Sequence, residues 1–379
     1  MIERLDVSNF RSVGPNQVLD LNSLTALVGT NASGKSSILK AFTFMADTVR
    51  LGLEGAVDAG GGIQALRRWA PTRPLQTHLG LLVKDDSRDT SIYYKFSLEP
   101  ASGGDYRVGE ELLIGKVDGQ SVHFSRHGEV WDKKPEGVNP LLGSRDLALT
   151  ALAGDERFRA ISETLRGMEV YDLQPERLRQ LQKPKLGLMD PLGGNWTTVL
   201  RSLAKKEWKP EMVEVLKRLT QDIDDIRIKS IGGFLVAEFH HSQGEMADKK
   251  SPWFPASQES DGTLRISAIM TALMQSPPMK LVGIEEPELC VHVGALGLLM
   301  DYIRETEGRS QVIISTHSTE LLDLLKPEEI RVVSRTEGFT RVGHLSKDQI
   351  SAVKTNLLKL GEVHRMEGLQ PEPVLVPEN

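Results

Sequence analysis

The sequence has few of the residues that mark secreted or membrane proteins. Its 379 residues include one cysteine, Cys290, so no internal disulfide is possible and nothing indicates an oxidising compartment. Only 5% of the residues are aromatic, and no run of about 18 uncharged apolar residues occurs, which excludes a membrane-spanning helix. The first residues carry charges where a signal peptide needs an apolar stretch. We therefore expect a globular, cytoplasmic protein that makes no membrane contact.

Positive charge does not predominate. The chain has 46 Lys and Arg against 52 Asp and Glu, a net charge of −6, which argues against indiscriminate coating of nucleic acid. A local basic patch is still possible, and one cluster is interleaved with Trp196 and Trp208. Such a cluster fits either a solvated helical face or a DNA-binding surface. Its cations are Arg177, Arg179, Lys183, Lys185, Arg201, Lys205, Lys206 and Lys209.

Alternation of apolar and polar residues predicts strands and a helix near the amino terminus. The strands are Ile2–Val7, Gln17–Leu21 and Leu24–Val28, and the helix runs from Lys35 to about Val49. The glycine-rich stretch Gly52–Gly62 predicts a mobile loop. Strand-like segments between residues 77 and 124 predict a second, antiparallel sheet.

The rest of the chain changes pattern twice. Residues 145–225 have a helical pattern interrupted by prolines. Two strand-like runs, Ile226–Ile231 and Phe234–Phe239, flank Gly232-Gly233, which is the pattern of a β-hairpin. Between residues 262 and 333 helices alternate with strands, which is typical of a parallel sheet.

The strongest motif lies between the third expected strand and the helix after it. Residues 29–36, GTNASGKS, fit the pattern G-x-x-x-x-G-K-S/T without a mismatch. The glycines let successive backbone N–H groups point at phosphate oxygens, and the helix N-terminus adds its positive end. We expect Lys35 to reach the β- and γ-phosphates of ATP and the Ser36 hydroxyl to bind Mg²⁺. The expected phosphate-binding residues are Gly29, Thr30, Asn31, Ala32, Ser33, Gly34, Lys35, Ser36 and Ser37.

A second motif is an apolar run, Leu281–Ile284, that ends in Glu285 and Glu286. Successive residues leave a strand in opposite directions, so two adjacent carboxylates can serve two roles. We expect Glu285 to bind Mg²⁺ and Glu286 to polarise the water that attacks the γ-phosphate. Such a strand end is often without function, and the phosphate motif upstream favours the functional interpretation.

A third motif is the strand-like run Val312–Ser315, which is followed by His317. An imidazole at this place can donate a hydrogen bond to a γ-phosphate. A single histidine at a strand end is more often structural, but its spacing behind the paired carboxylates favours function. The expected catalytic residues are Glu286, His317 and Lys35.

A fourth element, Ser260-Asp261-Gly262, directly precedes a predicted helix, which Ser260 can cap. By itself it is an ordinary capped helix. Taken in order, the four elements resemble the ABC-type ATPases of the SMC/RecF/OLD group, especially the short, stand-alone bacterial members. The segment Asn9–Ser12, NFRS, matches the amino-terminal signature of that group.

The resemblance implies further roles. Ser260 and Gly262 are implied to contact the γ-phosphate of the opposite subunit, in trans, and Arg11 to lie near the nucleotide. Residues 288–292 occupy the position of the family's D-loop. Gln174 is the candidate for the glutamine that approaches the metal, although a plain surface glutamine fits nearly as well.

The fold that the resemblance implies is α/β: a P-loop NTPase head of ABC type with a mixed and parallel core sheet. An antiparallel β-subdomain adjoins it and a helical lobe is inserted. The expected domains are an amino-terminal nucleotide-binding lobe (1–144), the helical lobe (145–225), a carboxy-terminal ATPase lobe (226–345) and a helix with an irregular tail (346–379). Too few residues follow Val333 for the TOPRIM nuclease domain of OLD proteins. Residues 145–225 also lack the heptads of an SMC coiled coil.

In such heads ATP and Mg²⁺ join two copies, so the resemblance implies a head-to-head homodimer around two ATP molecules. Hydrolysis would then switch a partner. Three outputs stay open at this point. The chain is the ATPase of a bacterial defence or stress system that acts through a separate effector protein, a RecF-like ATPase that binds DNA, or a nucleotide-dependent scaffold with little turnover.

Overall fold

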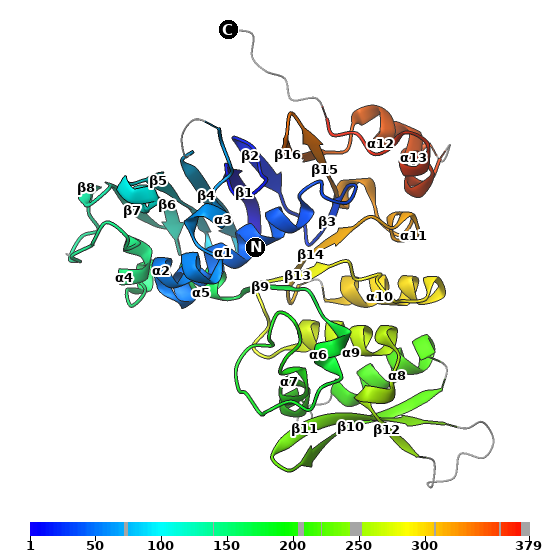
Figure 1. Cartoon of the computed structure of the whole chain (residues 1–379). Coiled ribbons are helices and arrows are strands. Elements are labelled where there is room, and N and C mark those ends of the chain that lie inside the picture. The colour runs from blue at the N-terminus through cyan, green and yellow to red at the C-terminus, as the bar shows by residue number, and fades with distance from the viewer. Residues whose placement is uncertain are drawn as a thin grey trace. The chain divides into compact units, whose positions relative to one another are not determined.

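The computed structural model describes residues 1–71, 75–138, 140–203, 208–220, 222–242, 252–306, 308–355 and 358–372. The chain divides into two compact units (Figure 1). The first comprises Met1–Glu169, Lys326–Leu358 and Met366–Asn379, and the second comprises Val170–Leu325 and Lys359–Arg365. No helix in the described part of the chain is long and apolar enough to span a membrane.

The first unit contains a seven-stranded antiparallel sheet in the order β2-β1-β4-β5-β6-β7-β8. Buried and partly exposed residues alternate along β5, as in a sheet with one face on the core. The strands expected from the sequence are confirmed. Strand β8 is an addition, because its mostly exposed side chains give no apolar pattern. The strands are β1 (Ile2–Ser8), β2 (Gln17–Asp20), β4 (Thr77–Asp85), β5 (Thr90–Pro100), β6 (Tyr106–Val117), β7 (Gln120–His127) and β8 (Val130–Lys133).

Helices cover the core face of this sheet (Figure 1). The ring of Phe44 in α1 (Lys35–Arg50) lies 5.6 Å from that of Phe10 and 6.3 Å from that of Phe96 in β5. Helix α5 (Glu156–Arg166) packs through Phe158, 5.6 Å from Phe124 of β7. The short helices α3 (Ile63–Leu66) and α4 (Ala148–Ala151) also belong to this unit.

The prediction of a loop over Gly52–Gly62 is wrong for most of its length. Helix α2 spans Gly52–Ala59 and buries Leu53, Ala56 and Val57. These residues recur at helical spacing, and their burial outweighs the entropic cost of the glycines. Glycines with positive φ flank the helix: Gly52 at its start has φ of 78°, and Gly61 and Gly62 after its end have φ of 90° and 85°.

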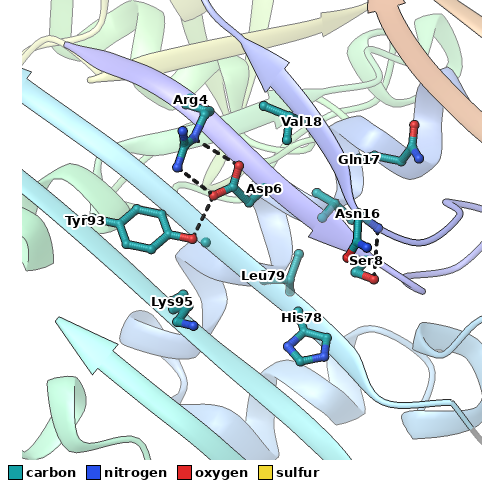
Figure 2. Close-up of a pocket in the computed structure, with 12 residues that line it drawn as sticks. Arg4, Asp6, Ser8, Asn16, Gln17, Val18, His78, Leu79, Tyr93 and Lys95 are labelled. Carbon is teal, nitrogen blue, oxygen red and sulfur yellow. Dashed lines mark hydrogen bonds and ion pairs between the residues drawn. The ribbon is translucent and has the colours of Figure 1, made fainter. Parts of the chain in front are cut away.

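The opposite face of the sheet carries a polar cavity of about 340 Å³ (Figure 2). Asp6 pairs with Arg4 at 3.0 Å and accepts a hydrogen bond from the Tyr93 hydroxyl at 2.7 Å. Gly80 helps to open the cavity, since a Cβ there would lie 3.0 Å from the Tyr93 hydroxyl. Figure 2 shows His78 and Lys95 beside this network. Burial lowers the pKa of His78.

The first unit also contains three strands of a mixed sheet. Strand β3 (Leu24–Val28) is buried throughout and pairs in parallel with β15 (Ile330–Thr336). Strand β16 (Phe339–His344) pairs antiparallel with β15. Helix α12 (Lys347–Lys354) follows β16 in the chain.

The second unit contains a parallel pair, β13 (Leu281–Glu285) and β14 (Gln311–Thr316), in which Glu285 lies opposite Ser315. Val170 of β9 (Met168–Tyr171) packs against Gly283, where a Cβ would lie 2.7 Å from the valine methyl carbon. The expected alternation of strand and helix is confirmed by α9 (Asp261–Met274), α10 (Val293–Glu305) and α11 (Thr319–Leu322).

A three-stranded antiparallel sheet completes the second unit and lies below α7 and α8 in Figure 1. The expected hairpin is confirmed as β10 (Ile223–Ile231) and β11 (Phe234–His241), with positive φ at Gly232 and Gly233. The third strand is β12 (Trp253–Pro255). The remaining helices are α6 (Pro175–Leu178), α7 (Trp196–Leu203), α8 (Trp208–Thr220) and α13 (Leu360–Glu367).

Candidate nucleotide-binding site

The phosphate motif forms the turn between β3 and α1. Ala32 and Gly34 have φ of 62° and 108°, the left-handed conformation that turns successive N–H groups to one side. A Cβ at Gly29 would collide with the carbonyl oxygen of Val333, and a Cβ at Gly34 with the Thr340 hydroxyl. Both positions therefore require glycine. Within the described residues no side chain caps α1, so its positive end suits an anion.

Lys35 lies across this loop. Lys35 is 7% exposed, and its Nζ donates hydrogen bonds to the carbonyl oxygens of Gly29 at 2.8 Å and Thr30 at 3.1 Å. The ammonium group is therefore held over the turn that the motif predicts to hold phosphate. A phosphate oxygen there gives it a charged acceptor in place of neutral carbonyls.

The Asn9–Ser12 segment is attached to the phosphate loop. The hydroxyls of Ser12 and Ser37 are hydrogen-bonded at 2.8 Å, and Ser12 is 2.9 Å from the Thr340 hydroxyl. Thr340 in turn donates to the carbonyl oxygen of Ser33 at 2.7 Å. Arg11 belongs to this segment, with φ of 52° and a partly exposed side chain.

Arg67, just after α3, is a residue that the motifs do not indicate. It is 5% exposed, and Nε, Nη1 and Nη2 have no hydrogen-bond partner among the residues that the structure describes. Burial lowers the pKa of its guanidinium, but arginine stays protonated in proteins. The backbones of Arg67 and Phe10 form an isolated bridge, and Arg11 N donates to Leu66 O at 2.7 Å. A buried cation without a partner beside this segment calls for an anion.

In the second unit, Glu286 follows the end of β13 with φ of 44°, and its N–H donates to Ser315 O at 3.1 Å. Arg265 of α9 holds this strand end, donating from Nη2 to the carbonyl oxygens of Glu285 at 3.2 Å and Glu286 at 2.8 Å. Burial lowers the pKa of Arg265, while Cys290 and nearby carboxylates oppose the shift. Arg265 is the one charge after Asp261 in the buried helix α9, and that sequence signal could have identified it.

The structure brings His317 and Glu286 together, with Nδ1 3.2 Å from Oε1. Glu288 Oε1 accepts from the Thr316 hydroxyl and, at 3.4 Å, from the His317 N–H, so it positions the histidine loop. Its second oxygen is buried and has no partner within the described ranges. The family resemblance implies a D-loop position for Glu288 and does not imply this role.

The Ser260 turn caps α9, because the Ser260 hydroxyl accepts from Thr263 N at 3.1 Å. Gly262 is required here, since a Cβ would collide with the carbonyl oxygen of Cys290. The turn and the segment after Glu286 therefore pack against each other. Gln174 lies at the N-cap of α6, and its side chain donates to Asp172 at 2.8 Å.

The chemistry of the donor set fits Mg²⁺. The residue types expected to bind the ion, a serine hydroxyl at Ser36 and a carboxylate at Glu285, are hard donors of the kind that Mg²⁺ prefers, and Mg²⁺ usually keeps several waters. Among the described residues no group of three or more His, Cys, Asp or Glu side chains is arranged for a metal. A site with few protein ligands and phosphate oxygens requires no such group.

The basic cluster is partly occupied by internal contacts. Arg179 pairs with Asp261, and Lys209 pairs with Asp225 at 2.7 Å. Trp196 is fully buried and donates from Nε1 to Leu178 O at 3.1 Å, so it is a core residue and offers no face to a base. Lys205, Lys206 and the Trp208 side chain lie outside the described part of the chain.

The fold is that of solved SMC heads, and the turn between β3 and α1 has the form of a phosphate-binding loop. Residues 121–323, more than half of the chain, match the family model described as "AAA domain, putative AbiEii toxin, Type IV TA system". The chain belongs to that family. Residues 1–99 match a second model, described as "AAA ATPase domain". No curated protein matches the chain.

Solved structures of SMC heads share the fold. A Smc head bound to the C-winged helix domain of ScpA is 16% identical, with a TM-score of 0.59, over 92% of this chain and 99% of that one. Another similar structure, from Pyrococcus furiosus, is a Smc head with an extended coiled coil bound to the C-terminal domain of ScpA. It is 13% identical, has a TM-score of 0.56 and covers 94% of this chain and 99% of its own. A Smc head with a coiled coil and joint from Pyrococcus yayanosii is 14% identical and has a TM-score of 0.50. The match covers 94% of this chain and 99% of that one.

Proposed function

We propose that the chain binds and hydrolyses ATP. The observation that carries this proposal is the phosphate loop: a buried strand, a turn whose two glycines cannot be replaced without collision, and a lysine held over that turn. Residues 29–37 bind the phosphates, and the cations of Arg11 and Arg67 balance their charge. Membership of an AAA family supports the same activity.

In the proposed mechanism Ser36 and Glu285 would hold Mg²⁺, and Gln174 is a further candidate ligand. When bound, Mg²⁺ neutralises negative charge on the β- and γ-phosphates. Glu286 accepts a proton from water, whose oxygen attacks the γ-phosphorus while the bond to the β-phosphate oxygen breaks. His317 donates from Nδ1 to Glu286, and in its protonated form Nε2 donates to the γ-phosphate.

The test is phosphate release from ATP with three variants. Lys35→Ala removes the cation over the loop and should abolish hydrolysis. Glu286→Gln should lower the rate by about 10²–10⁴-fold because it removes the general base. Glu305→Gln, an exposed change in α10, should behave like the unaltered chain. Equal rates in all four proteins would disprove the proposal.

We propose further that two copies close around two ATP molecules, each Ser260 turn completing the site of the other copy. The capped N-terminus of α9 gives this turn the dipole that suits a γ-phosphate. Glu286→Gln should accumulate an ATP-dependent dimer, because the contacts that hold it are not hydrolysed. Light scattering that shows only monomers with ATP would contradict this.

The family description names a putative toxin of a type IV toxin–antitoxin system. We propose that the ATPase switches a separate effector in bacterial defence or stress. The chain should protect its host in a phage challenge together with its neighbouring genes, and Lys35→Ala should remove the protection. Protection that survives Lys35→Ala would argue against an ATP-driven switch.

A further inference from the structure

His241, the last residue of β11, lies between two carboxylates. Its Nδ1 is 2.8 Å from Asp222 Oδ2, and its Nε2 is 2.8 Å from Glu259 Oε1. Carboxylates accept hydrogen bonds, so both ring nitrogens must carry protons for both bonds to form. Burial alone lowers the pKa of His241, but the bonds to Glu259 and Asp222 outweigh it and raise the pKa. The bridge is therefore built for an imidazolium.

Glu259 connects this bridge to the proposed nucleotide site. Its side chain is 5% exposed, and it immediately precedes Ser260. Its carbonyl oxygen accepts from Arg179 Nη2 at 2.8 Å, and Arg179 also pairs with Asp261. The turn is thus fastened by His241 through the Glu259 side chain and by Arg179 through its backbone.

Several elements pack against His241 and supply its charged and aromatic neighbours. Within the described residues, the charged groups bonded to it are Asp222, before β10, and Glu259, before α9. Phe254 of β12 presents its ring at 5.2 Å, edge to face. The neighbouring His240 pairs with Asp224 and packs on the ring of Trp253.

We propose that His241 is a positioning residue that holds the Ser260 turn in the conformation that engages the γ-phosphate of a second copy, and that it releases the turn on losing its proton. The inference rests on the proposed function, which gives the turn its role. A neutral imidazole donates only one hydrogen bond, so either Asp222 or the buried Glu259 then loses its donor.

The direction of the pH effect follows from the raised pKa. A group whose pKa is raised by folding contributes its stabilisation at low pH and loses it as the pH rises through the folded-state value. The turn is therefore fastened below the raised pKa of His241 and loosened above it. If hydrolysis needs two copies of the chain, the rate of ATP hydrolysis should fall as the pH rises above the pKa of His241.

The experiment compares His241→Asn with the matched control His240→Asn in ATP hydrolysis between about pH 6 and 9. The unaltered chain and His240→Asn should lose roughly tenfold in rate over the alkaline limb, by the loss of one charged hydrogen bond. His241→Asn should show the low rate throughout, without that limb. His241→Arg, which keeps its charge, should retain the rate at high pH. ATP binding to the single copy should be unchanged in all three variants.

Two results separate the possible failures. An unaltered chain whose hydrolysis does not exceed that of Lys35→Ala overturns the proposed function and this inference with it. An active chain whose pH profile is unmoved by His241→Asn overturns this inference alone. If that variant does not fold, NMR titration of the unaltered chain decides: a midpoint for His241 above the ordinary 6.5 supports the bridge, and one at or below it refutes it.

Discussion

Two arginines buried in the first unit differ in what surrounds them. Arg126 of β7 is fully buried: its Nε donates to Glu111 at 2.7 Å, and its Nη atoms reach the carbonyl oxygens of Gly128 and Asp146. Arg67 is almost as buried, yet its guanidinium has no partner among the described residues. The first charge is paired within the chain, and we infer that a bound anion balances the second. Partners, more than burial, distinguish a structural charge from a binding one.

The largest effect is expected from breaking the complete cluster. Glu111 also accepts from Ala148 N at 2.7 Å, Leu149 N at 3.0 Å and the Tyr94 hydroxyl at 3.1 Å. Glu111→Ala leaves Arg126 buried and uncompensated, so the free energy of unfolding should fall by about 3–5 kcal/mol. Urea denaturation measures it.

The control for this prediction is the neighbouring residue on the same strand. Glu110 faces the other side, where it pairs with Lys95 at 2.9 Å in a partly exposed position. Glu110→Ala should change the free energy of unfolding by no more than about 1 kcal/mol. Similar decreases in the free energy of unfolding for Glu111→Ala and Glu110→Ala would mean that the buried cluster contributes no more to stability than the exposed pair.

The second prediction concerns Arg67. Arg67→Met should leave the free energy of unfolding without nucleotide unchanged or raise it, because a buried, unpartnered cation is removed. The Kd for ATP should rise by roughly 10–100-fold, since a hydrogen bond to a charged group is worth about 1.5–3 kcal/mol. Calorimetric titration with ATP measures the affinity.

The neighbouring Arg68 is the matched control for Arg67. Its Nε donates to Asn9 Oδ1 at 3.1 Å, and its guanidinium lies 5.3 Å from the Phe339 ring centre, so it already has partners. Arg68→Met should leave the affinity for ATP almost unchanged. If the Kd for ATP rises in Arg68→Met and not in Arg67→Met, Arg68 and not Arg67 is the residue that binds the anion.

The sequence predicts best those features that depend on local residues, and it predicts poorly those that depend on contacts between distant parts of the chain. The phosphate loop, β3 and α1 follow from a local motif and local periodicity, and β13 with Glu285 and Glu286 follows from an apolar run. Arg67 has no such signal, because its burial depends on contacts with residues 57 positions earlier (67 − 10). The basic cluster around Trp196 predicts a solvated helical face or a DNA-binding surface, whereas tertiary packing buries the Trp196 ring. The roles of the site residues and the division at 144, 225 and 345 remain predictions.

Glu288 in the second unit extends the comparison to a carboxylate: one oxygen accepts hydrogen bonds, and the other has no partner in the part of the chain that the structure describes. Glu288→Ala should lower kcat by roughly tenfold with little change in KM, because it frees the loop that carries His317. Steady-state kinetics measure both constants. Glu320→Ala, an exposed change that removes a hydrogen bond from Ser318 at 2.9 Å, should leave kcat unchanged. A raised KM with an unaltered kcat would assign Glu288 to substrate binding.

The smallest effect is expected at the polar cavity on the outer face of the seven-stranded sheet (Figure 2). Tyr93→Phe removes the hydrogen bond to Asp6, but Asp6 keeps Arg4 at 3.0 Å. The free energy of unfolding should therefore fall by about 1 kcal/mol. Affinity for ATP should not change, because the charges of Arg4 and Asp6 compensate each other at 3.0 Å. A loss of ATP affinity comparable to that of Arg67→Met would show instead that the outer face is coupled to the phosphate loop, and that internal pairing does not separate structural charges from binding ones.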